Sequence, residues 1–190
     1  MNARHISQAR DTAGVGGLFV GGASKRMGRA KGMLVGPDGR TLVERASAVL
    51  VAAGLEVVLV GRRGVYADLG MSVLDDAVED AGPLGGLVSL LEHAGERRAV
   101  ALACDMPFVT QEDVLTLLEA TGPVAAPRRD GRWEPLCAMY APSVLPVARR
   151  RLAEGRRSMQ GLLEEVGAVE VAIDPDHVVD WDSPEDVNAR

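Results

Sequence analysis

Basic side chains crowd a glycine-rich stretch near the beginning of this 190-residue chain. They are Lys25, Arg26, Arg29 and Lys31. The apolar run 18–20 and the pair Gly21-Gly22 precede them, and no Asp or Glu lies between Asp11 and Asp38, although the chain has a net charge of −6. Glycines let backbone N–H groups approach a phosphate closely, and Lys and Arg neutralise its charge. The stretch therefore predicts a phosphate-binding loop after a strand, with a solvated basic loop as the alternative.

Two further places in the sequence carry carboxylates that could bind a metal ion. Asp105 follows the apolar run 99–103, and Asp180 and Asp182 lie in an acidic segment near the end of the chain. Ligands of open parallel sheets bind at the carboxyl ends of strands. Mg²⁺ that accompanies a phosphate is held by one or two carboxylates and by phosphate oxygens. Asp105 and Asp182 are therefore the candidate metal ligands, and a turn or an acidic approach to a helix is the alternative for each.

The basic loop fits neither of two common phosphate-binding signatures. It is not GxxxxGK[ST], because Gly32 follows Lys31, and its glycines do not have the GxGxxG spacing. A P-loop kinase and a nicotinamide-dependent dehydrogenase are both disfavoured.

Apolar runs that suit buried strands alternate with stretches of helical periodicity from residue 15 onwards. The predicted strands cover residues 15–20, 56–60, 71–74, 99–103, 124–126, 134–140 and 169–173. The predicted helices cover residues 42–53, a segment from 81–86 to about 94, 110 to about 120, 142–153, 158–166 and a last one from 183. This order is typical of βαβ units. We expect a three-layer α/β/α fold with a mostly parallel sheet.

The same pattern predicts the layout of the chain. We expect one domain over 14–190 after a flexible leader over 1–13, because no linker separates two domains. Thr110 and Asp113 resemble a capping box. The basic run 149–151 is expected on or near the solvent face of its helix.

Composition narrows the class of protein. With 47% hydrophobic and 25% charged residues the chain is typical of a globular protein. Its negative net charge argues against binding of nucleic acid or of anionic membranes, and no apolar run is long enough to span a bilayer. The start of the chain makes a poor signal peptide, so we expect a cytoplasmic protein. Cys104 and Cys137 lack metal-site spacing and are expected to be reduced core thiols.

The stretch 21–31, GGASKRMGRAK, resembles the LAGG-x-S-x-RMG-x-DK signature of nucleotidyltransferases. Further motifs make the chain similar to the molybdenum cofactor guanylyltransferases of the MobA type. They are GPLGG at 82–86, CDMPF at 104–108, EPL at 134–136 with Tyr140, and DSPED at 182–186.

The resemblance implies a Rossmann-like fold, like that of nucleotide-diphospho-sugar transferases, and a Mg²⁺-dependent transfer of GMP from GTP to molybdopterin with release of pyrophosphate. The residues implied at the nucleotide are Phe19, Val20, Gly21, Gly22, Asp76, Gly82 and Gly86. The residues implied in catalysis are Arg26 and Lys31 on the triphosphate and Asp105 on Mg²⁺. Asp180 and Asp182 would lie near the second substrate or the metal. The implied partners are GTP, molybdopterin and proteins that deliver the pterin or accept the cofactor.

Three departures from the family pattern keep alternatives open. Ala30 replaces the Asp before the lysine, Phe19-Val20 replaces Leu-Ala, and DWDSP at 180–184 replaces NxNTP. The last resembles the related cytidylyltransferases, whereas GPLGG and CDMP resemble the guanylyltransferases. One alternative is a cytidylyltransferase or another enzyme that transfers a nucleotide to a small phosphorylated acceptor. The other is a non-catalytic nucleotide-binding module in cofactor assembly.

Overall fold

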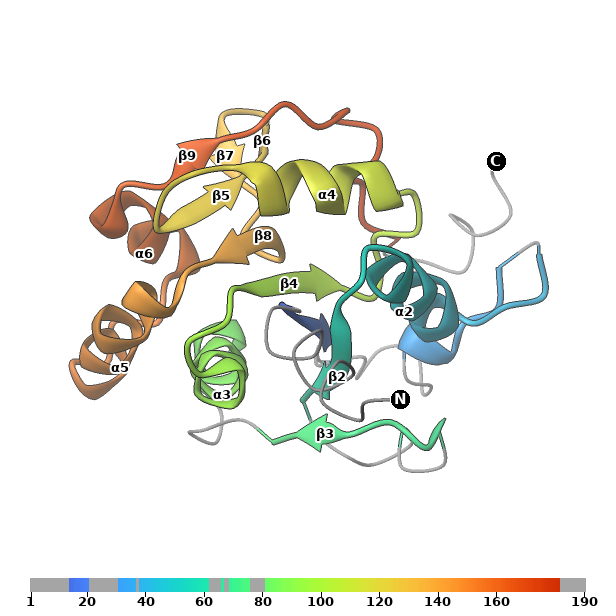
Figure 1. The fold of residues 1–190 in the computed structure, drawn as a ribbon, viewed down its shortest axis with the longest axis horizontal. Helices are drawn as coiled ribbons and strands as arrows, with labels where there is room; N and C mark the ends of the chain where they lie inside the picture. The colour runs from blue at the N-terminus through green and yellow to red at the C-terminus, as the bar shows by residue number, and fades with distance from the viewer. Residues whose placement is uncertain are drawn as a thin grey trace, which may run out of the picture.

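A seven-stranded sheet in the order β3-β2-β1-β4-β8-β5-β9 runs through the middle of the protein (Figure 1). The computed structural model describes residues 14–20, 31–36, 38–61, 66, 69–75 and 81–181. The strands are β1 Val15–Phe19, β2 Glu56–Val60, β3 Val73–Leu74, β4 Ala99–Ala103, β5 Val124–Ala126, β8 Cys137–Tyr140 and β9 Val169–Glu170. All neighbours are parallel except at β8, which is antiparallel to both β4 and β5. The expectation of a mostly parallel sheet is confirmed.

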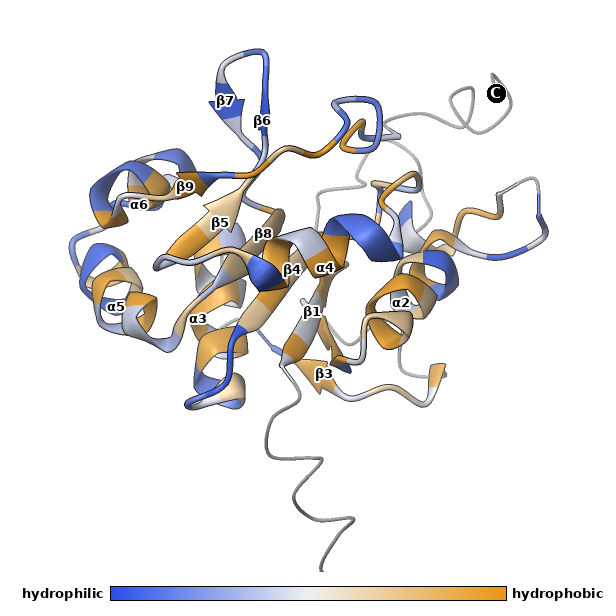
Figure 2. Ribbon diagram, turned by 45° about the horizontal axis from the view of Figure 1, so that its top comes forward, coloured by the Kyte–Doolittle hydropathy of each residue, from blue (hydrophilic) through white to orange (hydrophobic). Residues whose placement is uncertain are grey.

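Helices cover both faces of the sheet. They are α2 Leu42–Ala52, α3 Pro83–Ala94, α4 Gln111–Glu119, α5 Leu145–Ala153 and α6 Met159–Val166, with 3₁₀ turns η2 Lys31–Met33 and η4 Pro142–Val144. One buried cluster joins the sheet to α2 and α4, and another joins it to α3, α5 and α6. The apolar sides of the helices face the strands (Figure 2). These layers are the expected α/β/α arrangement.

Two glycines in β1 let helices approach this central strand from both faces. Successive residues of a strand point to opposite faces. A Cβ at Gly16 would lie 3.1 Å from Leu50 of α2, and a Cβ at Gly17 would lie 2.4 Å from Leu90 of α3. The absence of side chains at these two positions therefore sets how closely α2 and α3 pack around β1.

The strand expected over 134–140 is shorter than predicted. Residues 134–136 form a turn closed by the Cys137 amide, which donates to the Glu134 carbonyl at 3.0 Å. A hairpin of β6 Arg128–Arg129 and β7 Arg132–Trp133 precedes it and was not expected. Its Asp130-Gly131 turn has φ angles of 51° and 76°, which is the conformation that Asp-Gly favours in hairpins. The strand expected over 169–173 also ends early, at Glu170.

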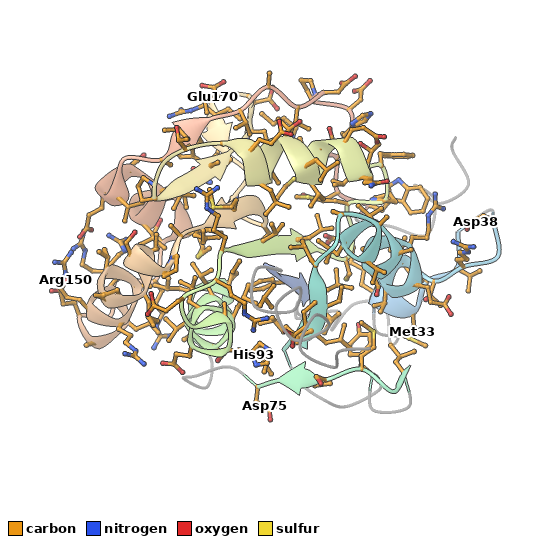
Figure 3. All side chains as sticks on the ribbon, viewed as in Figure 1. Met33, Asp38, Asp75, His93, Arg150 and Glu170 are labelled. Carbon is orange, nitrogen blue, oxygen red and sulfur yellow. The ribbon has the colours of Figure 1, made fainter. Side chains whose placement is uncertain are left out.

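The prediction of a solvent-facing basic run was wrong for Arg151, whose side chain is only 2% exposed. It follows Ala148, another buried residue, at the i, i+3 spacing of one helix face. Its guanidinium donates to Glu165 at 2.6 Å and to the Ser158 carbonyl at 3.1 Å. Arg150 is exposed and lies at the opposite end of the molecule from Met33 and Asp38 (Figure 3).

Three further expectations can be compared with the described residues. Cys104 and Cys137 are free thiols in the core, as predicted. Thr110 and Asp113 form the predicted capping box at the start of α4. Within the described ranges, no helix is long and apolar enough to cross a membrane. The expected leader over 1–13 and the helix expected from 183 lie outside the described residues.

Candidate active site

The order of strands reverses between β1 and β4, because β1 is followed in the sequence by β2 on one side and β4 lies on its other side. Both strands run parallel, and the Cys104 amide donates to the Phe19 carbonyl at 3.1 Å where they end. A ligand site is expected at such a switch point, outside the carboxyl ends of the strands.

Lys31 and Asp105 meet at this point. The Lys31 Nζ lies 2.6 Å from Asp105 Oδ2, and the two side chains are 20% and 22% exposed. Lys31 ends the basic loop and Asp105 follows β4. Because the pair is partly open to solvent, the ammonium can exchange the carboxylate for a phosphate oxygen, and the carboxylate can exchange the ammonium for a metal ion. The structure thus brings together two of the predicted site residues, one basic and one acidic, while their roles toward phosphate and metal stay predictions.

The turn η2, which carries Lys31, packs closely against α2 and Tyr66. The Leu34 amide donates to the Lys31 carbonyl at 3.0 Å, which closes η2. A Cβ at Gly32 would lie 2.6 Å from Val43 of α2 and 2.9 Å from the Tyr66 hydroxyl. A side chain at position 32 would therefore push Lys31 away from the strand ends.

Tyr66 supports this region and was missed by the sequence reasoning. Its hydroxyl lies 3.5 Å from the Val20 carbonyl, and its side chain is buried among residues that include Cys104. Burial, together with Cys104, raises the pKa of Tyr66 to about 12, so the hydroxyl stays protonated. No motif surrounds Tyr66 in the sequence, and its proximity to the site follows only from the tertiary fold.

The C-terminal segment after β9 returns to Asp105. The Trp181 amide donates to the Asp105 carbonyl at 2.9 Å. The Trp181 ring is buried and packs edge-on against Phe108, with ring centroids 5.6 Å apart. Further back, His177 Nδ1 lies 2.8 Å from Asp113 Oδ2 at the start of α4. These contacts hold the segment 171–181 along the carboxyl edge of the sheet.

Asp105 was one of two predicted metal ligands, and Asp182 lies outside the described residues. Among the residues that are described, no three His, Cys, Asp or Glu side chains cluster as a metal site. Mg²⁺ is commonly bound through one or two carboxylates while phosphates and waters complete its shell. A single partly exposed carboxylate such as Asp105 fits that mode of binding.

The glycines implied at the nucleotide lie at the start of α3. Gly82 precedes the helix with φ 68° and ψ −159°, a conformation that side chains disfavour, and Gly86 is buried. Ser89 of α3 donates to the Asp75 carbonyl at 2.8 Å, which joins this helix to the end of β3. The start of α3 therefore lies at the same edge of the sheet as Asp105.

A second cluster of charged side chains lies beyond the ends of β5 and β9. Arg129 Nε is 3.1 Å from Glu134 Oε1, and Arg129 Nη2 is 3.6 Å from Asp180 Oδ2. Burial of Glu134 raises its pKa, Arg129 opposes that shift and Asp180 adds to it. The hydroxyl of Tyr140 donates to the Pro135 carbonyl at 2.7 Å and fixes the turn that carries Glu134.

Of the other implied residues, Phe19 ends β1 and Val20 follows it. Phe19 is 6% exposed and its side chain packs in the core, and its carbonyl accepts from the Cys104 amide. Arg26, Gly21, Gly22 and Asp76 lie outside the described residues, as does Ala30.

Residues 16–170 match the family model of the MobA-like NTP transferase domain. The chain belongs to this family. It is 36% identical to a probable molybdenum cofactor guanylyltransferase of Opitutus terrae, over 94% of this chain and 95% of that protein. It is 33% identical to a molybdenum cofactor guanylyltransferase of Pseudomonas putida strain GB-1, over 88% of this chain and 92% of that protein. The resemblance inferred from the motifs is confirmed, and the protein is a nucleotidyltransferase.

Solved structures agree on the fold. The molybdopterin-guanine dinucleotide biosynthesis protein A of Archaeoglobus fulgidus matches with a TM-score of 0.74 and 24% identity, over 91% of this chain and 94% of that one. The 2-C-methyl-D-erythritol 4-phosphate cytidylyltransferase of Thermus thermophilus matches with a TM-score of 0.66 and 21% identity, over 92% and 96%. The Rossmann-like nucleotidyltransferase fold expected from the sequence is confirmed.

Proposed function

We propose that this protein transfers GMP from GTP to molybdopterin and releases pyrophosphate. The relatives with 36% and 33% identity carry the name of that activity. The observation that carries the proposal is the contact between Lys31 and Asp105 at the switch point, with 2.6 Å between nitrogen and oxygen. A cation for phosphates and a carboxylate for a metal ion stand side by side there.

The reaction makes few chemical demands on the protein. A phosphate oxygen of the acceptor forms a bond to the α-phosphorus of GTP, and the bond from that phosphorus to the pyrophosphate oxygen breaks. Both the nucleophile and the leaving group are already anionic oxygens, so alignment and neutralisation of charge are the main tasks. Lys31 would hold the triphosphate in this proposal.

Mg²⁺ is part of the proposal, and Asp105 would hold it together with phosphate oxygens. When bound, the ion neutralises charge on the triphosphate and on the leaving pyrophosphate. Asp182 and Arg26 keep their proposed roles as a second metal ligand and a triphosphate contact. Gly82 and Gly86 would shape the guanosine pocket. Binding to proteins that deliver or accept the cofactor, and a cytoplasmic location, remain predictions.

The preference for guanine or cytosine nucleotides is tested by measuring pyrophosphate release with molybdopterin and Mg²⁺ in the presence of either GTP or CTP. We expect release with GTP, and stabilisation of the protein against thermal unfolding by GTP with Mg²⁺. Release with CTP alone would assign the cytidylyl alternative. Stabilisation by a nucleotide without release of pyrophosphate would assign the non-catalytic module.

A further inference from the structure

The β6–β7 hairpin lies at the carboxyl edge of the sheet. β4 and β5 are both antiparallel to β8, so they point the same way and the chain leaves β5 at the edge where Asp105 lies. The hairpin is hydrophilic and projects beyond the sheet (Figure 2). The segment that follows β9 runs past it and along α4 (Figure 1).

The base of this hairpin is held firmly. Trp133 is buried, and Gln160 of α6 accepts from its amide at 3.1 Å and donates to its carbonyl at 2.7 Å. The Arg128 guanidinium lies 3.8 Å from the centre of the Trp133 ring. The Glu134 amide donates to the Pro127 carbonyl at 3.0 Å, which closes the hairpin. The neighbouring Arg129 therefore starts from a fixed backbone.

Arg129 joins two carboxylates that come from different parts of the chain. It contacts Glu134 at 3.1 Å, before β8, and Asp180 at 3.6 Å, after β9. The Glu134 side chain is only 14% exposed. Asp180 precedes Trp181, whose amide bonds to the Asp105 carbonyl. A continuous series of contacts thus links Arg129 to the residue beside Lys31.

The acceptor in the proposed reaction is an anion, because its nucleophile is a phosphate group. Two carboxylates without a cation between them would repel that group at the edge where it must approach the nucleotide. Arg129 offsets their charge, and its planar guanidinium can hold both at once.

We propose that Arg129 is a positioning residue for the acceptor: it neutralises Glu134 and Asp180 and fixes the segment beside Asp105, so that the phosphate of molybdopterin can approach. This inference rests on the proposed function. It concerns the approach of the acceptor, since Glu134 and Asp180, which Arg129 contacts, come from the turn before β8 and the segment after β9, whereas the nucleotide is proposed to bind at α3 and Lys31.

The experiment compares four variants with the wild type by pyrophosphate release, varying molybdopterin at saturating GTP and then GTP at saturating molybdopterin. R129Q is expected to raise the KM for molybdopterin at least tenfold while the KM for GTP stays within about twofold. R129K keeps the charge but lacks the planar guanidinium that reaches both carboxylates, so it should recover part of the loss. R129Q/E134Q removes a repelling carboxylate and should bind molybdopterin better than R129Q. R149Q removes the same charge away from the hairpin, where Arg149 pairs with Glu92 at 2.8 Å. It is the control and should keep the wild-type KM for molybdopterin.

The outcomes separate the inference from the proposed function. A wild-type protein that releases no pyrophosphate with molybdopterin and either nucleotide overturns both. An active wild type with an unchanged KM for molybdopterin in R129Q overturns the inference alone. Equal losses for GTP and molybdopterin, or no recovery in R129K and R129Q/E134Q, would also overturn it, because a purely structural ion pair would behave in that way. Thermal melting of each variant confirms that the folded protein is assayed.

Discussion

Replacement of Lys31 by Ala tests the centre of the site most directly. The Lys31 ammonium lies 2.6 Å from the Asp105 carboxylate, and about a fifth of each side chain is exposed. Nucleotide binding would exchange that contact for a phosphate oxygen while Mg²⁺ takes the carboxylate. The variant therefore loses only the difference between the two contacts.

The size of that difference can be estimated. A hydrogen bond to a charged group contributes about 1.5–3 kcal/mol, and an exposed ion pair contributes up to about 1 kcal/mol. Subtracting the full ion pair leaves a net loss of about 0.5–2 kcal/mol, which corresponds to roughly a two- to thirtyfold higher KM for GTP. The free energy of unfolding should fall by about 1 kcal/mol, because the partly buried ion pair with Asp105 is lost.

The assay is pyrophosphate release at varied GTP, accompanied by direct titration of GTP, because KM equals the dissociation constant only when chemistry is slow. Arg45→Ala is the matched control, since it removes a cation that pairs with Asp38 at 3.3 Å. An unchanged KM and dissociation constant for GTP in Lys31→Ala would refute the reasoning and leave Lys31 as a residue of a solvated loop. An equal effect in Arg45→Ala would show that net charge alone is responsible.

The other predictions concern catalysis, packing and pH. Asp105→Asn should lower kcat about 10²–10³-fold, because electrostatic stabilisation is usually the largest contribution to catalysis. Undiminished pyrophosphate release by this variant would exclude Asp105 as a metal ligand. Gly17→Ala places a Cβ 2.4 Å from Leu90. The cost of overpacking, about 1–3 kcal/mol, should exceed the gain of about 0.5–1 kcal/mol from removing a glycine in a strand. Urea denaturation should therefore show a lower free energy of unfolding. The hydrogen bond from Arg97 lowers the pKa of Glu56. The stabilisation that ionised Glu56 gives the fold is present above its pKa in the unfolded chain and is lost as pH falls through its pKa in the folded protein. The free energy of unfolding of Glu56→Gln should therefore fall less than that of the wild type between about pH 5 and 3. An equally steep decline in the variant would assign the acid sensitivity to other carboxylates.

Much of the fold could be predicted because local patterns determine it. The β-branched run 56–60 and the apolar run 99–103 form strands with the expected bounds. The hydroxyl of Thr110 and the carboxylate of Asp113, three residues apart, form their capping box as the spacing indicates. The loop after β1 and Asp105 after β4 were expected at one edge because the ends of parallel strands share it, whereas the contact between Lys31 and Asp105 is seen only in the structure.

The remaining features depend on contacts between distant segments. The bond between Trp181 and Asp105 joins residues with no shared motif, and local periodicity contains no information about such a pairing. The β6–β7 hairpin did have a signal, the Asp130-Gly131 pair, but a short polar strand lacks the apolar alternation by which strands are recognised. Arg151 was misplaced because its charge was given more weight than its spacing from Ala148.

The order of the strands divides the chemistry of this site between the two halves of the chain. β1, η2 and the start of α3 bring the residues proposed for the nucleotide, whereas the β6–β7 hairpin and the segment 171–181 bring those proposed for the acceptor. Asp105 belongs to both, because its carboxylate contacts Lys31 and its carbonyl accepts from Trp181. Variants of the first half should therefore change the KM for GTP, and variants of the second half the KM for molybdopterin. Among the described residues, variants at Asp105 should change kcat without favouring either substrate, since in the proposed reaction the two phosphates meet where these halves join.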